Sequence, residues 1–176
     1  MSLLAEEIVE EWLNRQGYFT IRGIKIGVDE IDLLAIRPQE NGIECRHLEI
    51  QASMRPVSYI TKVPKELQKK GKASGSRKKR SHDELKQGVD EWVEKKYRKR
   101  KKIEIMNKLC SGKWTKELVI NNVYSEEEVE MIAKNGISII RLKDVIRSMI
   151  GEKGIIQSAC GADFFDLINL SKDIGA

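Results

Sequence analysis

Two apolar segments between Val28 and Ser53 carry acidic residues at positions where a buried strand usually has apolar side chains. The first reads V-D-E-I-D-L-L-A-I-R-P and the second reads I-E-C-R-H-L-E-I-Q-A-S, with Asn41-Gly42 between them as a turn signal. Burial of a carboxylate without a partner costs several kcal/mol, so each acid in such a segment needs a specific neighbour. The pattern predicts two paired strands that bring a polar cluster together.

Alternation along these strands decides which side chains share a face. Residues two apart in a strand lie on the same side of a sheet. On the first segment, Glu30 and Asp32 share a face with Leu34, so the polar residues are confined to one end. If the strands pair around Asn41-Gly42, Asp32 and Glu49 come near each other across the ladder. The second segment places five residues on the polar face: Cys45, His47, Glu49, Gln51 and Ser53.

Two carboxylates held close together repel each other unless a cation lies between them. Mg²⁺ prefers oxygen ligands, takes one or two carboxylates and completes its octahedron with water and substrate phosphate. Such an ion polarises a phosphoryl oxygen and lowers the pKa of a bound water. Asp32 and Glu49 are therefore a candidate metal site for phosphodiester cleavage. The alternative is a structural pair that is neutralised by a nearby Arg or Lys.

Charge is unevenly distributed along the 176 residues, although the net value is only +5. The region 62–102 holds 17 Lys/Arg against 6 Asp/Glu, whereas the rest holds 15 against 21. A basic segment on an acidic body is typical of proteins with a polyanionic partner, most often nucleic acid, although a solvated basic run is the alternative. We expect the exposed basic residues of 77–80 and 95–102 to contact phosphates, in particular Arg77, Lys78, Lys79, Arg80, Lys95, Lys96, Arg98, Lys99 and Arg100.

Composition and length indicate one globular domain spanning 1–176, with a basic loop and helix at about 62–102. No stretch approaches the 18 apolar residues that a membrane-spanning helix needs, and the acidic start M-S-L-L-A-E-E does not resemble a signal peptide. We therefore expect a cytoplasmic protein without a membrane partner. Cys45, Cys110 and Cys160 show no metal-ligand or disulfide spacing, which favours reduced structural thiols.

Hydrophobic periodicity and turn signals give the element order α-β-β-β-α-β-α-β-α-α. Strands are expected at 18–22, 28–37, 43–53, 114–123 and 137–142, with a tight connection at 23–27 and a stop at Pro38. Helices are expected at 2–16, 81–102, 125–134, 144–150 and 162–170, the second and third beginning with capping boxes, Ser81 with Glu84 and Ser125 with Glu128. The first three strands should form an antiparallel meander, and the late strand-helix-strand passage should be parallel. The predicted class is α/β, an α+β fold with a mixed sheet.

An acidic helix, a strand with E-I-D-L-L-A, a strand with L-E-I-Q and a basic helix together resemble the PD-(D/E)xK nuclease superfamily. The similarity covers roughly 5–123 and is nearest to restriction-endonuclease-like and Holliday-junction-resolvase-like members. It implies a restriction-endonuclease-like core of order αβββαβ, followed here by further αβα elements. It also implies a Mg²⁺-dependent DNA endonuclease in restriction, repair or junction processing, with Mn²⁺ as a substitute ion and a homodimer as a possible assembly.

The resemblance also assigns residue roles. Asp32 and Glu49 would bind the metal, with the backbone carbonyl of Ile50 as a further ligand. Gln51 would stand where the family usually has Lys, and a first-helix Glu would join the site, with Glu6 the best fit and Glu7 and Glu10 as alternatives.

Gln51 is the departure from the family pattern. It can hydrogen-bond a water but brings no positive charge to the phosphate. Lys86, on the basic helix, is a candidate for supplying that charge. Three hypotheses follow: an active endonuclease, a catalytically weak or inactive nucleic-acid-binding module on the same fold, and an interaction protein whose basic segment binds an acidic partner.

Overall fold

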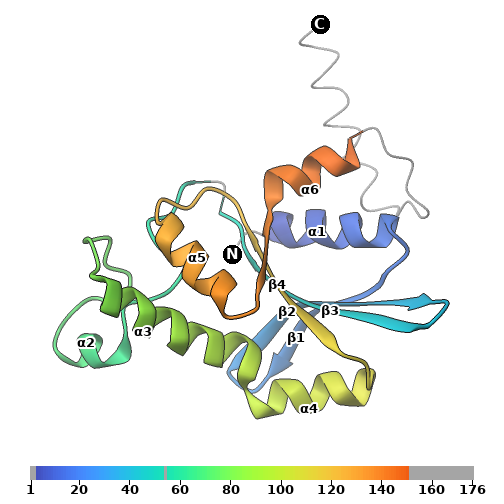
Figure 1. Cartoon of the computed structure of the whole chain (residues 1–176), viewed down its shortest axis with the longest axis horizontal. Coiled ribbons are helices and arrows are strands. Elements are labelled where there is room, and N and C mark those ends of the chain that lie inside the picture. Colours follow the sequence, from blue (N-terminus) through green and yellow to red (C-terminus); the bar gives the residue numbers. More distant parts are fainter. Residues whose placement is uncertain (1–2, 54, 151–176) are drawn as a thin grey trace, which may run out of the picture.

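A five-stranded sheet with the order β1-β2-β3-β4-β5 forms the centre of the protein in the computed structural model, which describes residues 3–53 and 55–150. Helices α1 and α6 lie on one side of the sheet, and α3, α4 and α5 lie on the other (Figure 1). The sheet is mixed, so the predicted α+β class is confirmed. Within the described residues, no helix has the length and apolar character needed to cross a membrane.

The strands pair as the sequence predicts. β1 (Phe19–Ile26), β2 (Asp29–Gln39) and β3 (Gly42–Gln51) form an antiparallel meander. β4 (Trp114–Ile120) and β5 (Ser138–Arg141) then add in parallel to β3 and to each other. The carboxyl ends of β3 and β4 therefore lie at the same edge of the sheet.

Helices cover both faces with apolar side chains. α1 (Leu3–Arg15) and α6 (Leu142–Met149) pack on a core that includes Leu33, Leu48 and Val119. α3 (His82–Val93) and α5 (Glu126–Lys134) pack on Leu118 and Ile120 from the opposite face. The remaining described helices are α2 (Lys65–Lys69), the π-helical segment η1 (Glu94–Arg98) and α4 (Arg100–Leu109).

Several predicted strand boundaries are wrong: β4 ends at Ile120, three residues before its predicted end, and β1 and β2 run past their predicted ends. β1 continues through the expected connection at 23–27, because Gly23 adopts φ +68° inside the strand and the turn follows only at Gly27. β2 continues past Pro38, which pairs with Ile43. Pairing with β1 ends at Ile36, so Pro38 has a neighbouring strand on one side only. Proline lacks a backbone N–H, and on the side without a neighbour no strand needs that donor.

The predicted long basic helix is divided into three parts. Ser81 and Glu84 form the expected capping box at the start of α3. The helix then changes to π geometry in η1, and Lys99 adopts an extended conformation (φ −59°, ψ 124°) before α4 begins. The division redirects the chain, so that both η1 and α4 carry lysines toward the sheet.

The capping box predicted at Ser125 is only half formed. Ser125 accepts a hydrogen bond from the Glu128 backbone N–H, but the Glu128 carboxylate binds residues of the 57–62 segment. Cys45 and Cys110 are free, buried thiols whose Sγ atoms lie 2.9 Å apart. Cys160 and the helix expected at 162–170 lie outside the described residues.

Candidate active site

The candidate site lies where β2 and β3 separate. Their ladder ends at the pair Leu33 and Leu48, so Asp32 and Glu49 are the next residues on each strand. Beyond this pair, the backbone N–H of Ile50 donates to a side chain and not to a backbone carbonyl of β2: its acceptor is Asp32 Oδ2, at 2.8 Å. The Asp32 side chain therefore bridges the gap between the strands and holds its carboxylate beside that of Glu49. The sequence pattern had predicted this proximity.

Two lysines balance the charge of the buried acids. Lys102 Nζ lies 3.0 Å from Glu49 Oε1, and the Lys96 ammonium bonds Glu49 Oε2 and lies 3.5 Å from Asp32 Oδ1. Lys102 Nζ also donates to the Lys96 carbonyl at 3.0 Å, which fixes the two lysine-bearing segments to each other. Both carboxylate side chains and that of Lys102 are at most 1% exposed, and that of Lys96 is 14% exposed. The four groups form a compact, nearly desolvated cluster.

The two carboxyl groups have opposite pKa shifts. Burial, together with the neighbouring Glu49 charge, raises the pKa of Asp32 to about 7. Burial alone would also raise the pKa of Glu49, but the His47 hydrogen bond and the ammonium groups of Lys96 and Lys102 lower it to about 2. Glu49 is therefore ionised throughout the physiological range, while Asp32 changes protonation state near neutral pH.

His47 supports Glu49 from the same strand face. Its Nε2 lies 3.3 Å from Glu49 Oε1, and its ring contacts Tyr97 at 4.8 Å between centroids. Burial lowers the pKa of His47, which favours the neutral imidazole. A neutral ring with its proton on Nε2 donates to Glu49. Its position is that of a hydrogen-bonded neighbour of the acid.

The π segment explains how the lysines reach this place. η1 carries Lys96 over the two carboxylates and buries Tyr97, whose hydroxyl donates to the Glu117 carbonyl at 2.6 Å. π segments inside helices often occur at functional sites because they reposition a side chain that regular α geometry would aim elsewhere. The extended Lys99 then starts α4 in a new direction, which brings Lys102 back to Glu49.

Glu6, Glu7 and Glu10 of the first helix all interact with Arg22. Burial raises the pKa of the Glu6 carboxyl, and the charges of Arg22, Glu30 and Lys96 also act on it. Glu7 and Glu10 approach Arg22 at 3.7 and 3.5 Å. Gln51 lies partly buried at the last position of β3, next to Ile50. The structure thus brings the predicted Asp32, Glu49 and Ile50 together, and Gln51 follows Ile50 on β3.

The carboxylate oxygens of the cluster are donors that a hard cation such as Mg²⁺ prefers, but Lys96 and Lys102 bond both oxygens of Glu49. Asp32 Oδ1 is buried and has no hydrogen-bond partner, although Lys96 is 3.5 Å away. Across the part of the chain that the structure describes, no group of three or more His, Cys, Asp and Glu side chains could hold a metal. Such an ion would therefore depend on Asp32, Glu49, the Ile50 carbonyl, water and substrate oxygens, which is an ordinary environment for Mg²⁺.

Comparison with known proteins adds a distant structural neighbour. No model of a protein family and no curated protein matches the chain. A solved structure described as AF1548, a protein of unknown function, is similar with a TM-score of 0.41 and 15% sequence identity. The match covers 86% of this chain and 62% of that one, so the chain spans less than two thirds of AF1548. A likeness of this degree carries no argument about function, and membership of the PD-(D/E)xK superfamily stays a prediction.

The expectation that the basic residues of 77–80 and 95–102 are exposed is wrong for Arg80, Lys96 and Lys102, and Lys99 is partly buried. Lys96 and Lys102 belong to the buried cluster, and Arg80, 8% exposed, donates to the Thr61 carbonyl at 3.1 Å. Arg77, Lys78, Lys79 and Lys95 are exposed as expected. Three others contact protein groups: Arg98 with Asn135, Lys99 with Asp29 and Arg100 with Glu104.

Sequence reasoning selected Lys86 as the source of the charge that Gln51 lacks, but Lys86 is exposed on α3 and Lys96 reaches the carboxylates. The role of Lys102 was missed altogether. The one signal for them is the run K-K-Y-R-K-R-K-K, in which a buried aromatic residue shows that part of the run faces the core.

Proposed function

We propose that this protein is a metal-dependent nuclease that hydrolyses phosphodiester bonds of DNA. One observation carries the proposal: Asp32 and Glu49 are held side by side at the end of the β2–β3 ladder, and Asp32 keeps a buried oxygen without a hydrogen bond. Most buried polar atoms in folded proteins are hydrogen-bonded. Asp32 Oδ1 instead faces the Lys96 ammonium at 3.5 Å, and a bound metal ion could replace that contact.

Each residue of the cluster would have a separate task. Asp32, Glu49 and the Ile50 carbonyl would hold Mg²⁺, which when bound polarises a phosphoryl oxygen and lowers the pKa of a water. Lys96 would exchange its carboxylate partners for the substrate phosphate and supply the positive charge that Gln51 lacks. Gln51 would hydrogen-bond the attacking water, and Lys102 would keep Glu49 ionised and oriented.

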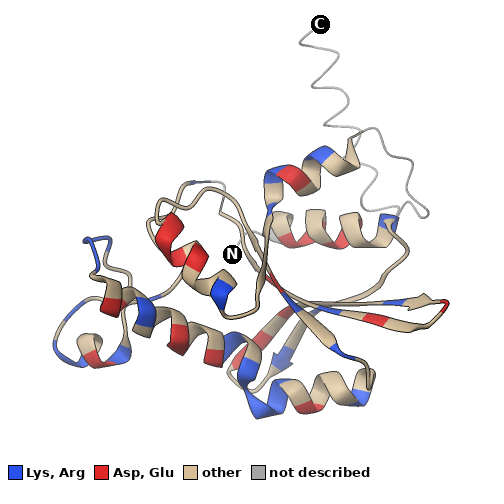
Figure 2. Ribbon diagram, viewed as in Figure 1, with Lys and Arg blue, Asp and Glu red and all other residues tan. Residues whose placement is uncertain are grey.

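DNA is the proposed substrate because exposed basic residues lie at both ends of α3. Lys and Arg side chains concentrate on the loop before α3 and at the junction of α3 and α4 (Figure 2). Arg77, Lys78, Lys79 and Lys95 are exposed there and available to phosphates. Contacts of this kind set affinity and salt dependence.

A second candidate function, a nucleic-acid-binding module without catalysis, is favoured by the lysine pair itself. Two ammonium groups already balance two carboxylates, so the cluster is electrically complete without a metal. In that case Lys96 and Lys102 would act as a permanent structural substitute for the cation.

A cleavage assay separates the two candidates. Supercoiled plasmid, a four-way junction, a flap and a single strand are each incubated with the wild-type chain in Mg²⁺, in Mn²⁺ and in EDTA. The nuclease proposal expects nicking or cutting of at least one substrate with a divalent ion and none in EDTA. Salt-sensitive binding without cleavage of any substrate would reject it in favour of the binding module. Tight protein association with a shallow salt dependence would instead favour an interaction protein.

Lys96→Met tests the role of the buried lysine. We expect cleavage to fall by about 10²–10³-fold, the usual effect of removing one group that stabilises transition-state charge. Mn²⁺ binding, measured by isothermal titration calorimetry, should become tighter, because the Lys96 ammonium no longer competes for the two carboxylates. Lys86→Met on exposed α3 is the control and should leave both readouts unchanged. Weaker Mn²⁺ binding in Lys96→Met would contradict this assignment.

A further inference from the structure

A groove lies beyond the carboxyl ends of β3 and β4, outside the candidate active site. Its volume is about 400 Å³, within the roughly 300–1,000 Å³ range of small-molecule sites. The segment 56–62, the loop residues 74–77, Arg80 and Tyr124 line it. Val57 bridges Val123 directly after these strands, so the groove lies on the sheet edge at which β3, the strand of Glu49, ends.

The wall of this groove is held rigidly by a buried acid. The Glu128 carboxylate accepts the backbone N–H groups of Ile60 and Thr61 at 2.6 and 3.0 Å, and the Thr61 hydroxyl at 2.5 Å. The same acid was expected to complete a helix cap, yet it is used to fix an irregular segment. A buried glutamate that orders a loop in this way pre-organises the surface the loop presents.

Arg80 forms another part of the groove wall and is held in place by its neighbours. Its guanidinium lies over the Tyr59 ring at 4.0 Å to the centroid and donates to Thr61 at two atoms. Arg80 lines the groove, so its fixed positive charge favours an anionic group there.

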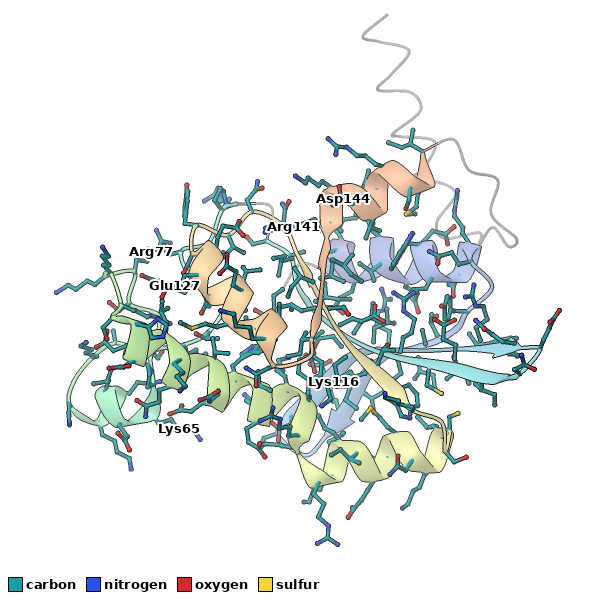
Figure 3. The ribbon with its side chains drawn as sticks, viewed as in Figure 1. Lys65, Arg77, Lys116, Glu127, Arg141 and Asp144 are labelled. Carbon is teal, nitrogen blue, oxygen red and sulfur yellow. The ribbon has the colours of Figure 1, made fainter. Side chains whose placement is uncertain are left out.

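The lining of the groove combines positive charge with an aromatic ring. Lys62, Arg77 and Arg80 line it, and no acidic residue is among the described residues that do so. Arg77 extends from the loop before α3 (Figure 3). Tyr124 is 74% exposed, so its ring is accessible to a ligand in the groove. Serine hydroxyls from both walls add hydrogen-bonding groups.

We infer that this groove binds a nucleotide of single-stranded DNA, with a base stacked on Tyr124 and its phosphate beside Arg77 and Lys62. Sequence-tolerant single-strand sites combine a basic groove with an exposed aromatic ring, because an unpaired base offers a stacking face that a duplex does not. The choice of DNA rests on the proposed function. The groove would direct a single-stranded arm of the substrate toward the edge where Glu49 and Gln51 lie, which specifies a branched or tailed DNA.

Binding in EDTA tests the inference without any cleavage. Fluorescence anisotropy compares a fluorescein-labelled dT oligomer with a duplex of equal length. Stacking on an aromatic residue contributes about 1–3 kcal/mol per base, so Tyr124→Ala should weaken oligomer binding by about 5–150-fold with little change for the duplex. Tyr124→Phe keeps the ring and should restore most of the affinity. Arg77→Gln should lower the salt slope of oligomer binding by about 0.7, and Lys143→Gln on α6 should not.

Three outcomes would overturn the inference: equal losses for oligomer and duplex, no loss in Tyr124→Ala, or tighter binding of an RNA oligomer than of DNA. The result is independent of catalysis. A chain that cuts nothing but binds single strands through Tyr124 would reject the nuclease and keep the groove. A chain that cuts DNA with unchanged activity and binding in Tyr124→Ala would reject the groove and keep the nuclease.

Discussion

Asp32→Asn should abolish metal-dependent cleavage and at the same time make the fold more stable at pH 8. An amide oxygen can still accept the Ile50 N–H, so the strand geometry is kept. The loss of one carboxylate removes the charge that would hold the cation, and we expect cleavage to fall by about 10³-fold or more, since a metal contributes several kcal/mol to such reactions.

The gain in stability follows from the pKa of Asp32, which burial and Glu49 raise from 3.8 to about 7. A carboxyl with a raised pKa in the folded state stabilises the fold below its unfolded value, and this contribution is lost as pH rises through the folded value. The wild-type protein should therefore lose free energy of unfolding between about pH 4 and pH 7, by at most about 1.4 kcal/mol per pH unit. The Asn variant has no proton to lose there, so its advantage should grow over that window and remain constant above it.

Urea unfolding of both proteins at several pH values, with cleavage measured in parallel, checks this prediction. Glu40→Gln at the exposed β2–β3 turn is the control and should change neither quantity by much. If the Asp32→Asn variant cleaves DNA at the wild-type rate, Asp32 is not part of the active site. An Asn variant that is less stable at pH 8 would show that ionised Asp32 is well paired in the fold.

Lys102→Met should lower the free energy of unfolding by about 1–3 kcal/mol, because the buried Glu49 loses one of its two ammonium partners and keeps Lys96. Lys102 is 1% exposed and bonds both Glu49 and the Lys96 carbonyl, so its removal weakens the cluster at two points. Methionine fills a similar volume, which limits any contribution from a cavity.

A double-mutant cycle identifies the cause of that loss. Lys102→Met combined with Glu49→Gln should cost less than the sum of the two single changes, because neither partner is then left as an isolated charge. Lys101→Met changes the exposed neighbour and should stay within about 0.5 kcal/mol of wild type. Strict additivity in the cycle would mean that Lys102 does not stabilise the fold through Glu49.

The sequence predicted the strands and the acidic pair because both leave a local pattern. Alternation along two adjoining strands places Asp32 and Glu49 together once the hairpin pairs, and a two-residue turn fixes that pairing. The connection predicted at 23–27 was wrong because a glycine with positive φ, such as Gly23, can occur either in a turn or in a distorted strand.

The lysines could not be assigned from the sequence for a different reason. A run of Lys and Arg has no apolar contrast, so its helical phase cannot be read, and neither the π segment nor the break at Lys99 has a distinctive residue. Burial of Lys96 and Lys102 depends on Glu49, which lies 47 and 53 residues away along the chain. Only the packed fold shows that these ammonium groups face an acid and not the solvent.

The π segment makes the spacing between α3 and α4 sensitive to chain length. A π turn holds one residue more than an α turn needs, so deletion of a residue from Glu94–Arg98 would let the helix return to regular geometry. If the deleted residue precedes Lys96, that side chain would take a position about 100° away around the helix axis, because an α-helix has about 3.6 residues per turn. In this part of the chain, insertions and deletions are therefore more disruptive than substitutions, because they change which lysine faces the acidic pair.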